Sequence, residues 1–119
     1  MTTQQLADRL VELCRAGRND ECYTELFSAD AESHEMPGVP DGSAKGTEAL
    51  LAKSEGWSEG VEEVHEMIVS DPMVYEDHFA VGMTIDMTNK EGKRTRDHEM
   101  CVYRVTDGKI ISERFHYAM

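Results

Sequence analysis

Basic residues are scarce in this 119-residue chain, which has 12 lysines and arginines against 24 aspartates and glutamates. The resulting formal net charge of −12 would repel a phosphate backbone or an anionic membrane surface. We therefore expect neither a nucleic acid nor a membrane as a partner. The chain also has no apolar run of roughly 18 residues, the length that a membrane-spanning helix needs.

Cysteines are equally sparse, with three in the chain, at positions 14, 22 and 101. They form no CxxC motif and no Cys/His spacing typical of a metal site, so we expect no bound metal. The first residues lack the basic and apolar stretches of a secretory signal. An odd number of cysteines without such a signal predicts reduced thiols in a cytoplasmic protein. Nucleotide-binding glycine motifs are also absent, and we expect no cofactor.

The residues that are present suit one globular domain over residues 1–119. Hydrophobic residues make up 39% and charged residues 30%, values typical of a folded domain with a core. The length is sufficient for one domain but too short for two.

Three helices are predicted in the first half of the chain. Residues 2–16 form an amphipathic pattern, and Thr2 with Gln5 forms a capping-box pattern at its start. A second helix is predicted over 20–28 and a third from 47 to about 57. The buried side of the third helix is predicted to consist of Leu50, Leu51, Ser54 and Trp57.

Extended segments dominate the second half. A short strand is predicted at about 31–36, followed by a loop over 37–46 that is rich in proline and glycine. The remaining strands are predicted over 62–70, 73–76, 78–89, 94–106 and 109–118. Asp107-Gly108 is a strong hairpin signal. Helices followed by hairpins predict an α+β fold. Since the central strands are apolar on both faces, we expect helices to cover one face and a second subunit the other, in a homodimer.

Two segments resemble SnoaL-like and ketosteroid-isomerase-like domains of the nuclear transport factor 2-like class. The first is FSADAESHEMPG at 27–38 with GTEAL at 46–50, and the second is VYRVTDGKIISERFHY at 102–117. The resemblance extends over nearly the whole chain. It implies a cone-shaped, curved antiparallel sheet, or half-barrel, covered by three N-terminal helices around a small-molecule pocket. This superfold hosts isomerases, cyclases, hydratases, hydrolases and non-catalytic proteins, so it does not specify an activity.

The resemblance implies a role for Glu35, which matches the general base that the isomerases place at the end of the first short strand. A base that acts on a C–H bond has to be partly desolvated so that its pKa rises towards the working pH. The alternative is a solvated glutamate beside a loop. The tyrosine that the isomerases place on the first helix has no counterpart here, because Tyr23 falls on the second helix.

Several other side chains are candidates on strand patterns alone. His65, Tyr103 and Tyr117 could polarise a ligand oxygen, although each could also be an ordinary core or surface residue. Acidic residues that interrupt apolar strands could form a carboxylate pair with separated pKa values, or could lie on the wet face. The candidate ligand-binding residues are Trp57, Asp86, Glu99, Glu113 and Phe115.

These observations leave three functions open. The first is an enzyme of the isomerase, cyclase or lyase type that transfers a proton on a small, apolar, carbonyl-bearing molecule. The second is a binding module that holds such a ligand without turning it over. The third is a dimeric interaction protein whose cavity is filled by side chains. A one-residue register slip at Asp71-Pro72 would exchange the pocket and outer residues of the flanking strands.

Overall fold

The computed structural model describes residues 1–118, which begin with two helices, α1 (Thr3–Arg15) and α2 (Asn19–Glu25). A third helix, α3 (Thr47–Glu59), follows the first two strands. The predicted capping box of α1 is confirmed: the Gln5 backbone N–H donates to Thr2 Oγ1 at 3.1 Å, and the Thr2 backbone N–H donates to Gln5 Oε1 at 2.9 Å. No helix in the described part of the chain is long and apolar enough to cross a membrane.

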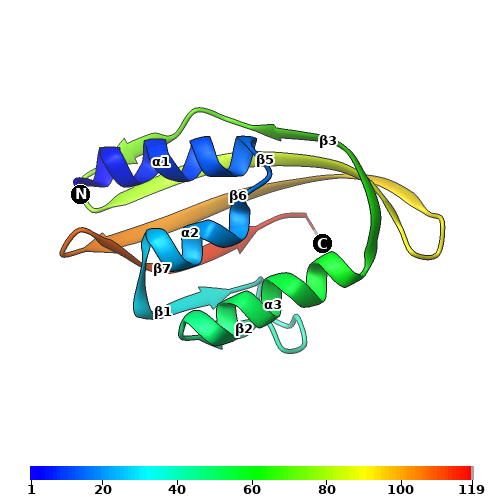
Figure 1. Ribbon diagram of the computed structural model, residues 1–119, viewed down its shortest axis with the longest axis horizontal. Coiled ribbons are helices and arrows are strands. Elements are labelled where there is room, and N and C mark those ends of the chain that lie inside the picture. The colour runs from blue at the N-terminus through cyan, green and yellow to red at the C-terminus, as the bar shows by residue number, and fades with distance from the viewer. Residues whose placement is uncertain (119) are drawn as a thin grey trace.

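Seven strands form one curved sheet on which the helices pack (Figure 1). They are β1 (Phe27–His34), β2 (Ser43–Lys45), β3 (Val61–Val69), β4 (Met73–Tyr75), β5 (His78–Asn89), β6 (Arg94–Thr106) and β7 (Lys109–His116). Their order is β2-β1-β7-β6-β5-β3, and β4 also pairs with β5. The predicted α+β half-barrel is confirmed. One strand pair, β1 with β7, is parallel within the otherwise antiparallel sheet.

Several elements differ from the sequence prediction because of strand pairing. The first strand spans Phe27–His34 rather than about 31–36. The second helix ends at Glu25 rather than at residue 28, because Phe27 already pairs with Ile110 of β7. The predicted loop over 37–46 contains the short strand β2, which pairs with the end of β1 through contacts such as Ser33 with Ala44. These elements depend on partners that are distant in sequence, so local pattern could not reveal them.

The sheet has two distinct faces, which β5 and β6 define. Their register is uninterrupted, with Phe79 opposite Tyr103 and Met83 opposite Glu99, so odd-numbered residues of both strands share one face. We call this the inner face because the helices cover it, and the opposite one the outer face. The inner face is extended by β7, where Glu113 lies opposite Tyr103, and by β1, where Ser33 lies beside Glu113.

The core fills the space between the inner face and the helices. Burial there is nearly complete: Phe79 and Val81 of β5 are each 1% exposed. The helices contribute Leu6, Leu10, Leu13, Cys14, Cys22 and Leu50 to this core. The predicted core positions of Cys14 and Cys22 are therefore confirmed.

The turn between β6 and β7 has the geometry that its sequence predicts. Asp107 has φ 51° and Gly108 has φ 75°, both in the left-handed region. Two consecutive positive φ angles are the requirement of a type I′ hairpin, and Asp-Gly satisfies it at low steric cost. After this turn a register shift between Arg104 and Val105 moves the pairing by one residue, and this shift places Glu113 opposite Tyr103.

Candidate functional site

A buried carboxyl group, Glu113, lies on the inner face among polar side chains. It is 3% exposed, and the Tyr23 hydroxyl donates to its Oε1 at 2.8 Å. Burial penalises the charged form and raises the pKa of Glu113 to about 7. The Tyr23 and Ser33 hydroxyls and the Lys53 ammonium oppose this rise, whereas the charge of Glu35 adds to it. The pKa of Glu113 therefore lies where both protonation states are populated near neutral pH.

Ser33 lies beside Glu113 on the parallel strand β1 and is fully buried. Its hydroxyl is close enough to favour the charged form of Glu113. Even so, Ser33 Oγ makes no well-formed hydrogen bond with any described residue. An unpartnered buried hydroxyl costs free energy, which makes this position an exception within the core.

A second polar group forms where β1 and β7 end. Lys53 Nζ of α3 donates to Glu35 Oε2 at 2.6 Å, and the Tyr117 hydroxyl donates to Glu35 Oε1 at 2.9 Å. The Glu35 and Lys53 side chains are 22% and 24% exposed. Lys53 Nζ also lies 4.8 Å from the centroid of the Phe115 ring, in cation–π contact. Burial and the hydrogen bond to Glu35 raise the pKa of Tyr117, so its hydroxyl stays protonated and able to donate.

Glu99 and Tyr103 of β6 complete the inner-face cluster, which we define as Tyr23, Ser33, Glu35, Lys53, Glu99, Tyr103, Glu113 and Tyr117. Burial and the charge of Glu35 raise the pKa of Glu99, and the Cys101 thiol approaches Glu99 Oε1 at 3.7 Å. Tyr103 is 3% exposed and stacks on Phe79 with ring centroids 4.7 Å apart. Within this cluster, three carboxyl groups share one ammonium group, that of Lys53.

The structure places two candidates, His65 and Asp86, on the outer face and away from this cluster. His65 Nε2 is 2.6 Å from Thr88 Oγ1, because the bulge between Val64 and Glu66 changes the register of β3. Asp86 alternates with the inner-face residues of β5 and accepts two hydrogen bonds from Arg94, at 2.9 and 3.0 Å. The hydrogen bonds from Arg94 lower the pKa of Asp86.

The expected burial of Trp57 is wrong, because this side chain is 48% exposed. Leu50 is the buried residue of α3, and every position from 55 to 59 is exposed. The last turns of α3 extend past the elements that cover its first turns (Figure 1). Lys53 is the residue that the sequence analysis missed on this helix. It follows Leu50 by three positions, a spacing that places it on the same face of the helix.

A hollow of about 430 Å³ adjoins the inner-face cluster. It lies between the loop over 35–42 and the ends of β1 and β7, and Glu35 and Phe115 are among its lining residues. We call it the end hollow. The other residues that line it are His34, Met36, Pro37, Gly38, Val39, Gly42, Ser43, Arg114 and His116.

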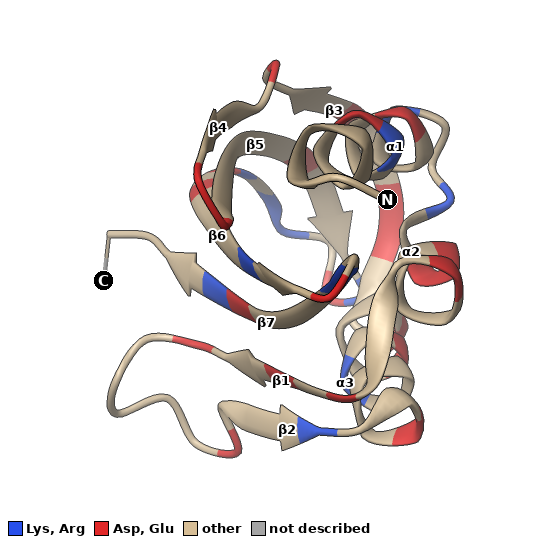
Figure 2. Ribbon diagram, turned by 90° about the vertical axis from the view of Figure 1, so that its left-hand side faces the viewer, with Lys and Arg blue, Asp and Glu red and all other residues tan. Residues whose placement is uncertain are grey.

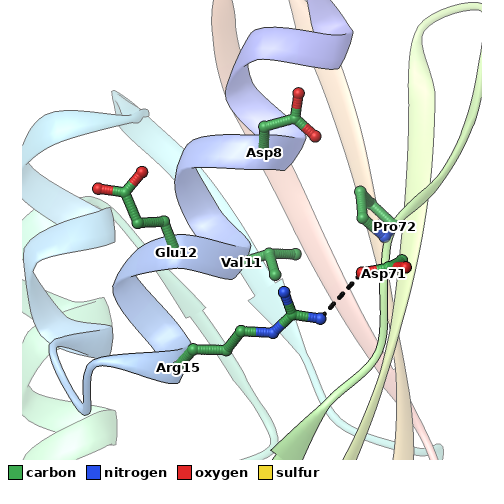
Figure 3. A pocket seen from close by; sticks show the side chains of 6 residues that line it. All are labelled: Asp8, Val11, Glu12, Arg15, Asp71 and Pro72. Carbon is green, nitrogen blue, oxygen red and sulfur yellow. Dashed lines mark hydrogen bonds and ion pairs between the residues drawn. The ribbon is translucent and has the colours of Figure 1, made fainter.

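A separate hollow of about 310 Å³ lies between α1 and the Asp71-Pro72 segment (Figure 3). Arg15 Nη2 reaches across it and donates to the Val69 carbonyl at 2.8 Å and to Asp71 at 3.0 Å. These bonds attach α1 to the edge of the sheet, a structural role. Within residues 1–118, no group of three or more His, Cys, Asp or Glu side chains is arranged to hold a metal ion.

Comparison with known proteins identifies the family. The family model of the SnoaL-like domain matches residues 1–117. The chain is a SnoaL-like protein. A crystal structure from Mesorhizobium loti, described as that of a candidate SnoaL-like polyketide cyclase, shares 36% sequence identity with it. That match covers 98% of this chain and 100% of the other, with a TM-score of 0.92.

More distant structures share the fold of this SnoaL-like protein. TerC, co-crystallised with polyporic acid, is 14% identical, with a TM-score of 0.79 and coverage of 98% and 92% of the two chains. A ketosteroid-isomerase-like protein from Catenulispora acidiphila, in complex with trimethylamine, is 17% identical, with a TM-score of 0.76 and coverage of 99% and 88%. No curated protein matches the chain. The predicted family is confirmed.

Proposed function

We propose that this SnoaL-like protein binds a small carbonyl compound at the inner-face cluster and catalyses proton transfer on it, with Glu113 as the group that exchanges the proton. The observation behind this proposal is the buried Glu113 carboxyl, whose pKa of about 7 suits both acceptance and return of a proton at neutral pH. The relative that is described as a candidate polyketide cyclase supports the choice of a carbonyl substrate.

In the proposed chemistry Glu113 accepts the proton, and Lys53 and Tyr117 stabilise the charge that forms on the substrate oxygen. Tyr23 donates to Oε1 of Glu113, so Oε2 is available to accept a proton from a carbon next to a carbonyl group. Breaking that C–H bond moves its electron pair towards the carbonyl oxygen and gives an enolate. Lys53 and Tyr117, which both donate to Glu35 in this structure, are the donors that could stabilise the enolate oxygen. Return of the proton from Glu113 to another atom completes the transfer.

In this proposal the general base is Glu113, whereas the family resemblance had suggested Glu35. Glu35 accepts two hydrogen bonds, one of them from a cation, and so holds Lys53 and Tyr117 in place. Glu113 has the desolvated environment that a carboxylate base needs.

Hydrogen–deuterium exchange tests this proposal without knowledge of the product. Cyclic ketones and β-diketones would be incubated with the protein in D₂O, and loss of the proton signal next to the carbonyl followed by NMR. Wild type is expected to accelerate exchange of at least one compound. Glu113→Gln should reduce that rate at least 100-fold, the lower range for loss of a general base. Glu66→Gln, an exposed glutamate on the outer face, is the matched control. Equal rates in Glu113→Gln and wild type would reject the role of Glu113.

We also propose that the protein forms a homodimer through the outer face. Four large apolar side chains of that face, Ile68, Met73, Tyr75 and Met100, are 46–73% exposed. Apolar groups clustered on one face of a sheet are typical of protein–protein contacts. Light scattering should give twice the chain mass for wild type and the monomer mass for Met100→Lys; a monomeric wild type would contradict the dimer.

The three free thiols are consistent with a cytoplasmic protein.

A further inference from the structure

Arg114, at the end of β7, differs from every other arginine of the described chain. The other six each pair with a carboxylate: Arg9, Arg15, Arg18, Arg94, Arg96 and Arg104. Within residues 1–118, Arg114 has no such partner. In a chain with twice as many acidic as basic residues, an arginine without an ion pair is notable.

Arg114 lines the end hollow, between two histidines. His116 follows it on β7, and His34 lies beside it on the parallel strand β1. Figure 2 shows a basic position on β7 next to an acidic one. Apolar walls are supplied by Met36, Pro37 and Val39 of the loop. A hollow of about 430 Å³ is large enough for a small organic molecule.

Two carboxylates on or next to β1, Glu32 and Glu35, have partners other than Arg114. Glu35 accepts from Lys53 Nζ at 2.6 Å, and Glu32 lies 3.7 Å from His34 Nε2. Neither of these carboxylates forms an ion pair with Arg114. An anion that binds in the end hollow could therefore pair with the Arg114 guanidinium.

We propose that the end hollow binds the carboxylate group of a small organic molecule, with Arg114 as its main partner. The planar guanidinium presents two parallel N–H donors that match the two oxygens of a carboxylate. One fixed positive charge matches one negative charge, whereas a phosphate dianion would add a second charge close to Glu32 and Glu35. The apolar walls suit the carbon skeleton that bears the carboxylate.

This inference does not depend on the proposed function. Arg114 lies opposite Val102 and alternates with Glu113 along β7, so it is on the outer face, whereas Glu113 is on the inner face. Glu35 and Phe115 are the residues through which the end hollow borders the inner-face cluster.

Titration of ¹⁵N-labelled protein with benzoate and with benzamide tests the carboxylate subsite. These probes have the same ring and differ in charge. Wild type is expected to bind benzoate at least tenfold more tightly, with shifts at residues that line the end hollow. Arg114→Gln should abolish this preference and Arg114→Lys should reduce it. Arg104→Gln removes another exposed arginine of the same face, which pairs with Asp77 away from the end hollow, and should leave the preference unchanged.

Three outcomes would overturn the inference. They are equal affinity for benzoate and benzamide, a preference that persists in Arg114→Gln, and tighter binding of inorganic phosphate than of benzoate. Failure of the proposed function would look different, since Glu113→Gln and wild type would exchange protons from ketones at equal rates. Because benzoate binding requires no proton transfer, Glu113→Gln should retain the wild-type preference for benzoate.

Discussion

The two faces of the sheet each contain a carboxyl group with little exposed surface, and their pKa values move in opposite directions. On the inner face, burial raises the pKa of Glu113 to about 7. On the outer face, hydrogen bonds from Arg94 lower the pKa of Asp86. Glu113 is 3% exposed and Asp86 is 9% exposed, so low exposure does not by itself decide the direction. The difference lies in the partner, which is a neutral hydroxyl for Glu113 and a guanidinium for Asp86.

The largest effect is expected from Glu113→Gln. Because the pKa of Glu113 is raised in the folded state, wild-type stability should fall as pH rises from about 4.5 to about 7. Glutamine carries no ionisable proton, so the variant does not lose this stability as pH rises. Above pH 7, Glu113→Gln should be more stable than wild type by about 3 kcal/mol, with little difference below pH 4.5. Urea unfolding of both proteins at pH 4 and pH 8 would measure it. A gap that does not change with pH would contradict the raised pKa.

The next effect concerns the only ammonium group of the inner-face cluster. Burial raises the pKa of both Glu99 and Glu113, and the charge of Lys53 opposes this rise. Lys53→Met should therefore raise the pKa of Glu113 above about 7. Side-chain carbon NMR across a pH series would detect the change, with Lys45→Met on the exposed strand β2 as the control. An unchanged Glu113 midpoint would show that Lys53 does not act on it.

A smaller effect, with the opposite pH dependence, is expected for Asp86→Asn on the outer face. Since the pKa of Asp86 is lowered in the folded state, its contribution to stability is present at neutral pH and is lost as pH falls below the ordinary value of 3.8. Asp86→Asn should be less stable than wild type at pH 7 and should approach it in acid. Arg94 is well exposed, so solvent screening keeps the difference modest. A gap that widens in acid would contradict this account.

The smallest effect is expected at Ser33. Its buried hydroxyl has no hydrogen-bond partner among the described residues, so its removal leaves no donor or acceptor unpaired. Thermal unfolding of Ser33→Ala at pH 5, where Glu113 is mostly protonated, should give a stability within about 0.5 kcal/mol of wild type or slightly higher. A loss of several kcal/mol would show that the hydroxyl has a partner.

Local patterns in the sequence predicted much of the fold but only part of the site. The periodicity of the first helix, the capping box of Thr2 and the Asp107-Gly108 turn were correct, whereas the end of the second helix and the burial of Trp57 on the third were not. The features that were correct depend on neighbouring residues alone. The strand β2 was missed because it exists only through pairing with β1.

The limits of the site prediction have the same physical origin. A bulge in β3 decides on which face of the sheet His65 lies, and no local sequence pattern predicts that bulge. Lys53 was missed because a charged residue on a helix is normally solvated, and only its pairing with Glu35 across the fold draws it inward. Glu113 was a candidate on strand alternation, but its near-complete burial depends on β1 and α2, which are distant in the sequence.

The claim that Glu113 exchanges a proton near neutral pH is tested most directly by its own titration. The side-chain carboxyl carbon of Glu113, assigned by comparison with Glu113→Gln, would be followed by NMR from pH 3 to pH 9. The structure predicts a midpoint of about 7. A midpoint near the ordinary value of 4.5 would contradict the account, because Glu113 would then be permanently ionised at neutral pH and poorly suited to return a proton.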